Sequence, residues 1–211
     1  TVVLNAGRLE MLTALNEMRD KLKPEDNLLI YYAGHGEIDA DGQGYWVPTD
    51  GVAGNAKSWI SNRAVSDILD TLPARHVLVV ADSCYSGTMT RASVPTFATA
   101  AMPPDKWNGW VKAMVEGRSR TALTSGGVMP VPDTGSGRHS YFARAFLNVL
   151  QDNNRLLEGQ RLFQEVATSL ALGAMDAPLA QSPEYAPIRY AGHESGEFFF
   201  LPRDAARATG P

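Results

Sequence analysis

The spacing of apolar residues changes along the chain and predicts its first elements. Over residues 8–22 and again over 59–72, apolar side chains recur every three or four positions, which is typical of amphipathic helices. Residues 28–33 and 77–81 are near-continuous apolar runs, typical of parallel strands buried on both faces. The order helix, strand, helix, strand predicts a mostly parallel sheet with crossover helices.

The second half of the chain has a weaker pattern with longer polar loops. Residues 88–104 are small and polar and contain three prolines, which indicates an exposed loop. A short hairpin-like piece is expected at Tyr45-Trp46-Val47. Further helices are expected at 106–116, 140–150 and 161–172, and further strands at 121–124 and 198–201. We interpret residues 1–203 as one domain and residues 204–211 as a linker or tail.

Composition narrows the class of protein. A chain of 211 residues that is 44% hydrophobic suits one domain with a full core. A net charge of −4 argues against a nucleic-acid partner held by a basic field. No apolar run approaches the roughly 18 residues of a membrane span, and nothing at Thr1 resembles a signal peptide. We therefore expect a cytoplasmic protein without nucleic-acid or membrane partners.

The single cysteine, Cys84, is the other compositional clue. One cysteine forms no internal disulfide, so the fold does not depend on an oxidising compartment. Neither a CxxC nor an HExxH spacing occurs, which argues against a structural zinc site. The thiol is therefore either an inert core residue or a reactive group.

A candidate active site lies where the two apolar runs end. His35 follows the run at 28–33 in NLLIYYAGHG, and Cys84 follows the run at 77–81 in HVLVVADSCYSG. Functional groups gather at the carboxyl ends of parallel strands, and adjacent strands are about 5 Å apart. An imidazolium beside a thiol supplies thiolate, and the imidazole then protonates the leaving amine. The backbone N–H groups of Gly36 and Cys84 are candidates to bind the oxyanion.

Two other interpretations use the same residues. A lone cysteine at a strand end is more often a small buried hydrophobe, and a lone histidine is more often structural than catalytic. A redox-sensing thiol would use Cys84 without a partner histidine. The pair, with each member after an apolar strand and flanked by glycine or serine, favours catalysis over both.

YYAGHG and DSCYSG resemble the two catalytic blocks of the caspase-like cysteine peptidases, and the Asp-Ser-Cys form is closest to metacaspases and bacterial orthocaspases. GYWVPTDG, TALTSGG and AGHESGEFFFLP extend the resemblance over nearly the whole chain. The resemblance implies a caspase-hemoglobinase-like three-layer α/β/α sandwich around a mostly parallel sheet. It also implies a cysteine endopeptidase that acts on protein or peptide substrates.

Carried over residue by residue, the resemblance assigns a role to each site residue. His35 is the general acid/base and Cys84 the nucleophile, and the amides of Gly36 and Cys84 form the oxyanion hole. Asp82 is an acidic wall of the S1 pocket, and Ser125 lies on the strand and loop that line it. A carboxylate in that pocket attracts Arg or Lys at P1 and repels Asp.

The chain departs from the family pattern in two places. Family members usually begin with a strand, a helix and a strand before the point where this chain starts, so we expect a companion N-terminal fragment of the same protein. Some metacaspases carry an acidic pair that binds calcium, but the nearest equivalent here, Ser61-Asn62, is uncharged. We therefore expect no metal, no cofactor and no calcium requirement.

The resemblance does not decide after which residue the site cleaves, or whether the site is active. Cleavage after Arg or Lys is the first interpretation, and an Asp-specific peptidase or an inactive caspase-like scaffold are the alternatives. Self-cleavage is a further hypothesis, because basic residues follow the nucleophile, among them Arg91, Lys106, Arg118 and Arg120.

Overall fold

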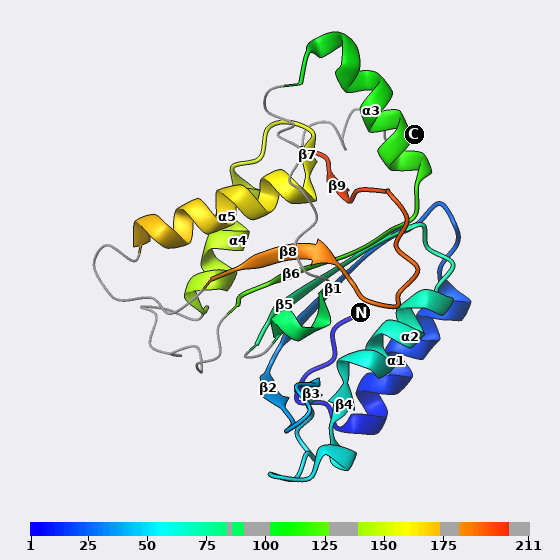
Figure 1. The fold of residues 1–211 in the computed structure, drawn as a ribbon, viewed down its shortest axis with the longest axis vertical. Coiled ribbons are helices and arrows are strands. Elements are labelled where there is room, and N and C mark those ends of the chain that lie inside the picture. Colours follow the sequence, from blue (N-terminus) through cyan, green and yellow to red (C-terminus); the bar gives the residue numbers. More distant parts are fainter. Residues whose placement is uncertain (84–85, 91–101, 127–138, 174–181, 203–211) are drawn as a thin grey trace.

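The computed structural model describes residues 1–83, 86–90, 102–126, 139–173 and 182–202 (Figure 1). Residues 204–211, expected to be a linker or tail, lie outside this part of the chain. The elements are, in chain order, α1 (Arg8–Lys21), β1 (Asn27–Ala33), β2 (His35–Ile38), β3 (Gly44–Val47), η1 (Ala56–Ser58), β4 (Ile60–Ser61), α2 (Asn62–Thr71), β5 (His76–Asp82), η2 (Ser86–Met89), α3 (Pro104–Glu116), β6 (Ser119–Thr124), α4 (Tyr141–Gln151), β7 (Leu157–Glu158), α5 (Gly159–Gly173), β8 (Glu184–Pro187) and β9 (Phe199–Phe200).

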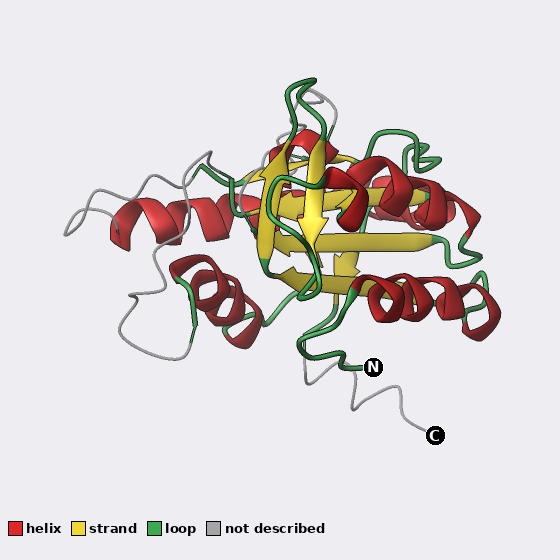
Figure 2. Cartoon of the chain, turned by 90° about the horizontal axis from the view of Figure 1, so that it is seen from below, coloured by secondary structure: helices red, strands yellow, loops and turns green. Residues whose placement is uncertain are grey.

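A four-stranded sheet in the order β1-β5-β6-β8 forms the middle layer. Its first three strands are parallel, and β8 runs antiparallel to β6. Helices α1 and α2 cover one face, and α4 and α5 cover the other (Figures 1 and 2). This arrangement confirms the predicted α/β/α sandwich with a mostly parallel sheet.

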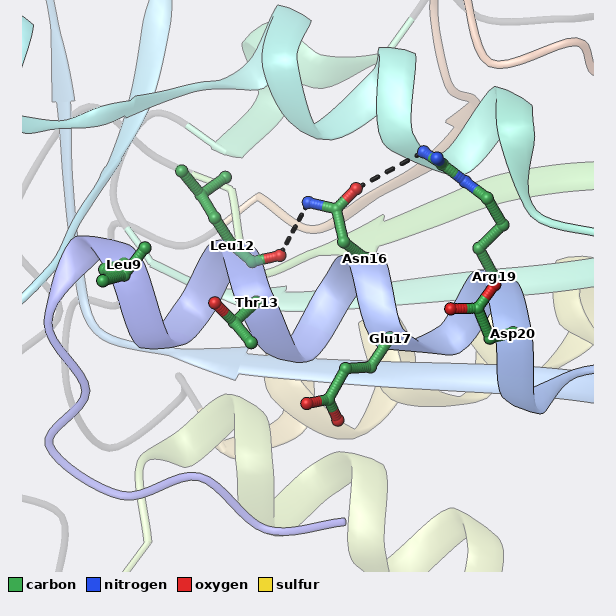
Figure 3. Close-up of a pocket in the computed structure, with 7 residues that line it drawn as sticks. All are labelled: Leu9, Leu12, Thr13, Asn16, Glu17, Arg19 and Asp20. Carbon is green, nitrogen blue, oxygen red and sulfur yellow. Dashed lines mark hydrogen bonds between the residues drawn. The ribbon is translucent and has the colours of Figure 1, made fainter.

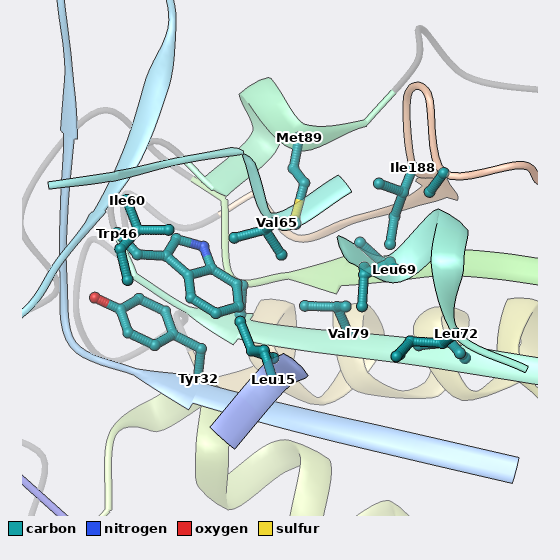
Figure 4. Packing of buried hydrophobic residues seen from close by; sticks show 14 of the residues in the cluster. Leu15, Tyr32, Trp46, Ile60, Val65, Leu69, Leu72, Val79, Met89 and Ile188 are labelled. Atoms are coloured by element: carbon teal, nitrogen blue, oxygen red, sulfur yellow. The ribbon is translucent and has the colours of Figure 1, made fainter. Parts of the chain in front are cut away.

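Strand β5 explains why its sequence is continuously apolar. Val77, Val79 and Ala81 pack into the core beneath α1 and α2, part of which is shown in Figure 4. Leu78 and Val80 point to the opposite face and pack with α4 and α5. All five are fully buried, and each large side chain buried in this way contributes about 1.5–3 kcal/mol. A strand with helices on both faces therefore has no polar side.

The prediction that residues 28–33 form a strand is confirmed, but the expectation that both faces are buried is wrong. Strand β1 lies at the edge of the sheet and alternates between exposed and covered positions. Leu29 and Tyr31 keep 37% and 40% of their surface exposed, whereas Tyr32 is buried. In the described part of the chain, β1 pairs only with β5. An apolar sequence alone does not distinguish a central strand from this edge strand.

Two small sheets flank the central one. The hairpin expected at Tyr45-Trp46-Val47 is present as β2 and β3, extended by β4. The helix expected over 59–72 begins only at Asn62, because Ile60 and Ser61 pair with β3 instead. The strand expected at 198–201 is β9, which pairs with β7. The sequence pattern did not predict β8, although this strand completes the central sheet.

Arg120 ties β6 to the end of α2. Its side chain is fully buried and donates five hydrogen bonds to the carbonyl oxygens of Leu69, Leu72, Ala74, Arg75 and Ser119, at 2.8–3.0 Å. The last carbonyls of a helix have no partner within the helix, and a guanidinium is well suited to bind several of them. Burial lowers the pKa of Arg120 to about 10, so the side chain stays charged at neutral pH.

Candidate active site

The carboxyl ends of β1 and β5 lie side by side. Ala33 is the residue of β1 directly opposite Asp82 of β5, and both are the last residues of their strands. His35 stands two positions beyond Ala33, and Cys84 stands two positions beyond Asp82. Cys84 itself lies outside the described residues. The register therefore brings the two predicted catalytic segments to one edge of the sheet, at the same level.

His35 is the first residue of β2 and is exposed. Its backbone is held from below by Tyr32, whose hydroxyl donates a 2.7 Å hydrogen bond to the His35 carbonyl oxygen. The Tyr32 ring stacks on Trp46 with the ring centres 4.2 Å apart (Figure 4). Burial raises the pKa of Tyr32 to about 12, so its hydroxyl remains a donor at any physiological pH. A rigid aromatic pair thus fixes the backbone that carries the imidazole.

Gly34, the residue before His35, allows a close contact with Tyr32. A Cβ on Gly34 would lie 2.7 Å from the Tyr32 hydroxyl oxygen, so any side chain there would displace that hydroxyl. Gly36, the predicted oxyanion-hole residue, is buried and stands opposite Trp46 in the β2–β3 pair. The chain therefore turns tightly out of β1 at Gly-His-Gly, and His35 is the only one of these three residues that carries a side chain.

Asp82 accepts two hydrogen bonds from hydroxyl groups that lie far apart in the sequence. The hydroxyls of Tyr31 and Ser140 both donate to its Oδ2 atom, at 3.2 and 2.5 Å. Burial raises the pKa of Tyr31 above its ordinary value, and the charge of Asp82 raises it further. Ser140 Oγ also accepts from the backbone N–H of Ala143 at 2.9 Å, which caps α4. Asp82 therefore links β1, β5 and the start of α4.

Tyr31 and Ser140 were missed by the sequence reasoning. Tyr31 lies in an apolar run, where its hydroxyl gives no signal of its own. Ser140 gave only the signal of a helix N-cap. Their common contact with Asp82 depends on the β1–β5 register and on the position of α4, which no local pattern encodes.

Ser125 follows β6 and is completely buried. Its backbone N–H donates to the Ala81 carbonyl oxygen at 3.0 Å, and its hydroxyl donates to the Ser83 carbonyl oxygen at 3.3 Å. Ser125 therefore supports the backbone just before Cys84. The predicted role of Ser125 in lining the S1 pocket stays a prediction.

One surface groove in the described part of the chain lies away from this edge of the sheet. A shallow groove of about 390 Å³ runs along α1 and is lined by that helix alone, with Leu9, Leu12 and Asn16 among its residues (Figure 3). Among the described residues, no group of three or more His, Cys, Asp or Glu side chains is arranged to hold a metal ion. Within the same part of the chain, no helix is both long and apolar enough to cross a membrane.

Comparison with known proteins gives the family. The model of the caspase domain, a peptidase family, matches residues 1–189. The chain therefore belongs to the caspase-domain peptidase family. No curated protein matches it at a significant level.

Solved structures support the fold. A caspase-1 from Spodoptera frugiperda is 15% identical with a TM-score of 0.56, and the match covers 89% of this chain and 70% of the caspase. The protein GSU0716 from Geobacter sulfurreducens is 16% identical with a TM-score of 0.52, and the match covers 90% of this chain and 77% of that protein. At these identities the likeness concerns the fold alone.

Proposed function

We propose that the protein is a cysteine endopeptidase in which His35 and Cys84 act as the catalytic pair and cleavage follows Arg or Lys. Membership of a peptidase family supports the reaction class. The observation that carries the proposal is the register of Ala33 with Asp82. Because the strands are about 5 Å apart, the segments that continue from them to His35 and Cys84 start as immediate neighbours.

The chemistry follows from this neighbourhood. The imidazole of His35 favours the thiolate of Cys84, which attacks the scissile carbonyl carbon and forms a tetrahedral oxyanion. The backbone N–H groups of Gly36 and Cys84 stabilise that oxyanion. The imidazolium then gives its proton to the leaving amine, and the acyl-enzyme is hydrolysed by water activated by the same imidazole. These steps require no metal or other cofactor.

The preference for a basic P1 residue rests on Asp82. Its carboxylate lies two positions before the nucleophile and is oriented by the hydroxyls of Tyr31 and Ser140. A guanidinium or ammonium group gains a charge-assisted hydrogen bond from such a carboxylate, whereas an Asp side chain is repelled. We therefore favour Arg or Lys over Asp at P1.

Fluorogenic peptides that differ only in Arg, Lys or Asp at P1 test the proposal, with and without calcium. We expect turnover after Arg and Lys that disappears in Cys84→Ala and His35→Ala. Asp82→Asn should lower kcat/KM for the Arg peptide by about 100-fold, with little effect on labelling of Cys84 by a small thiol reagent. Turnover only after Asp would refute the role of Asp82, and no turnover in any peptide would favour the scaffold alternative.

Self-cleavage is restricted by the positions of the basic residues. The prediction is wrong for Arg120, because its side chain is fully buried in β6 and cannot enter an active site from the folded chain. Arg118 is held in an ion pair with Asp70 at 3.1 Å. Lys106 is exposed in the first turn of α3, and Arg91 lies outside the described residues. Fragments that end at Arg91 or Lys106, seen by intact mass in wild type and absent in Cys84→Ala, would support self-cleavage. Fragments that end at Arg120 would contradict this assignment.

We also propose that the outer edge of β1 accepts a strand from a companion N-terminal segment of the same protein. The seven residues of β1 carry no charged side chain, and an uncharged apolar edge strand is a template for pairing with another strand. In the isolated chain, the backbone amides on this edge should exchange with deuterium much faster than those of β5. Addition of the companion segment should protect them. Equal protection of β1 and β5 in the isolated monomer would refute the proposal.

A further inference from the structure

A second cavity, of about 230 Å³, lies beside the β2–β3 hairpin. Its walls come from the hairpin turn, the first turns of α2, η2 and the turn after β8. The side chains that matter here are those of Asp41, Asn62, Arg63, Thr88 and Arg189. Neither His35 nor Asp82 lines it, so the cavity is distinct from the candidate active site.

The buried amide of Asn62 is an unsatisfied hydrogen-bond acceptor in this cavity. Asn62 is only 6% exposed, and its Nδ2 atom donates to Thr88 Oγ1 at 2.7 Å. Its Oδ1 atom is buried and accepts no hydrogen bond from the described residues. A Cβ on Gly44 would lie 2.6 Å from Asn62 Nδ2 and 1.9 Å from Thr88 Oγ1, so β3 holds the pair tightly in place. A buried acceptor without a donor is costly, and a ligand N–H group that reached Asn62 Oδ1 would remove that cost.

Positive charge lines the same cavity. Arg189 donates from Nε to the Thr90 carbonyl oxygen at 2.6 Å, and its other two guanidinium nitrogens have no acceptor within the described part of the chain. Arg63 lies over the ring of Tyr190, 4.2 Å from its centre, while its Nε atom pairs with Asp67 at 2.8 Å. The N-terminus of α2 adds the positive end of a helix dipole. A carboxylate is the group best matched to an anchored guanidinium with two free nitrogens.

We infer that this cavity is a binding site for a carboxylate that carries a neighbouring N–H group, as in a free acidic amino acid or an acidic residue of a peptide. The carboxylate pairs with Arg189, and the N–H group donates to Asn62 Oδ1. Asp41, an exposed residue of the turn between β2 and β3, offers a second acceptor for an ammonium group. The small volume excludes much larger ligands, because drug-sized molecules need cavities of about 300–1,000 Å³.

One wall of the cavity is formed by the short helix that follows the proposed nucleophile in the sequence. Thr88 and Met89 belong to η2, which begins two residues after Cys84. A ligand that bonds to Asn62 and packs on η2 therefore contacts the helix that follows the thiol in the sequence. An effect on peptide turnover rests on the proposed function, whereas binding itself does not.

Isothermal titration on wild type and on Cys84→Ala tests binding independently of catalysis. The probes are L-aspartate and the peptide acetyl-Gly-Asp-Gly-amide. Their controls are the matching Asn peptide, which lacks the carboxylate, and succinate, which lacks the N–H group. We expect saturable binding of aspartate or of the Asp peptide, and binding of both controls at least about tenfold weaker. Binding of aspartate alone would assign a free amino acid, and binding of the Asp peptide alone would assign a peptide ligand.

Matched variants then locate the bound molecule. Arg189→Gln removes an exposed side chain with few internal contacts and should weaken binding at least about tenfold. Asn62→Ala removes the acceptor for the N–H group and should weaken binding similarly. Arg155→Gln, which removes an exposed arginine paired with Glu165, is the control and should leave affinity unchanged. No saturable heat with either probe, or binding unaffected by Arg189→Gln, would overturn the inference.

Discussion

Glu197 offers the sharpest test of how a largely buried carboxyl group outside the candidate active site affects stability. Its Oε1 atom accepts hydrogen bonds from the Tyr185 hydroxyl and from the backbone N–H of Phe198, the latter at 2.7 Å. Tyr185 lies on β8 and also contacts Thr121 of β6, so this carboxyl group joins the central sheet to the segment before β9. Burial, and to a smaller extent the charge of Glu158, raise the pKa of Glu197 from 4.5 to about 7, while the hydrogen bonds lower it. We predict that Glu197→Gln removes a pH dependence of the folding free energy.

The direction and the size of this pH dependence follow from the linkage between proton binding and folding. A carboxyl group whose pKa is higher in the folded protein binds its proton more tightly there. Its contribution is therefore complete below pH 4.5 and is lost as the pH rises through about 7. A difference of about 2.5 pKa units corresponds to about 3 kcal/mol. Since the residue keeps some contact with solvent, we expect a loss of about 2 kcal/mol between pH 5 and pH 8. Glutamine has no proton to lose and still accepts both hydrogen bonds.

Urea unfolding at pH 5 and pH 8 measures this difference. Wild type should lose about 2 kcal/mol more than Glu197→Gln over this interval, so the variant should be the more stable protein at pH 8. Glu116→Gln, which changes a carboxylate that is 66% exposed on α3, is the matched control and should follow wild type. Parallel loss of stability in wild type and Glu197→Gln would refute the reasoning. It would show that Glu197 is already ionised in the folded protein at pH 5, or that the structure relaxes around the charge.

Three further predictions concern the parts that position the site. Arg120→Met leaves five carbonyl oxygens without their donor and should lower the free energy of unfolding, measured by urea unfolding, by about 3–5 kcal/mol. A loss below about 1 kcal/mol would contradict the structural role of Arg120. Tyr32→Phe removes the hydrogen bond to the His35 carbonyl and should lower kcat about tenfold at an unfolding cost near 1 kcal/mol, whereas an unchanged kcat would show that the stacked ring alone positions the histidine. Ser140→Ala removes one donor to Asp82 and should raise KM for an Arg peptide severalfold, with little effect on kcat; equal effects on KM for Arg and uncharged peptides would refute an electrostatic role.

The sequence by itself determined the layered fold and the location of the candidate site. Strand β5 must pack helices on both faces, so its residues are all apolar and the run is visible without a structure. The helices have the amphipathic spacing that a covered sheet requires, and most of their bounds were predicted to within a few residues. His35 and Cys84 were predicted to lie close together because the carboxyl ends of parallel strands lie at the same edge of the sheet. That reasoning uses only the parallel direction of the strands, which the alternation of helix and strand along the sequence predicts.

Tertiary structure alone decided the contacts between segments far apart in the chain. The apolar sequence of β1 does not reveal an edge strand, because edge or centre depends on which strands pair with it. The short strand β8 has too few residues for a periodic signal, and β6 determines its position. The convergence of Tyr31 and Ser140 on Asp82, and the burial of Arg120 beneath α2, arise from packing between elements that are 45 or more residues apart. A sequence pattern reports what each element must bury, whereas the polar contacts that orient the site depend on which elements meet.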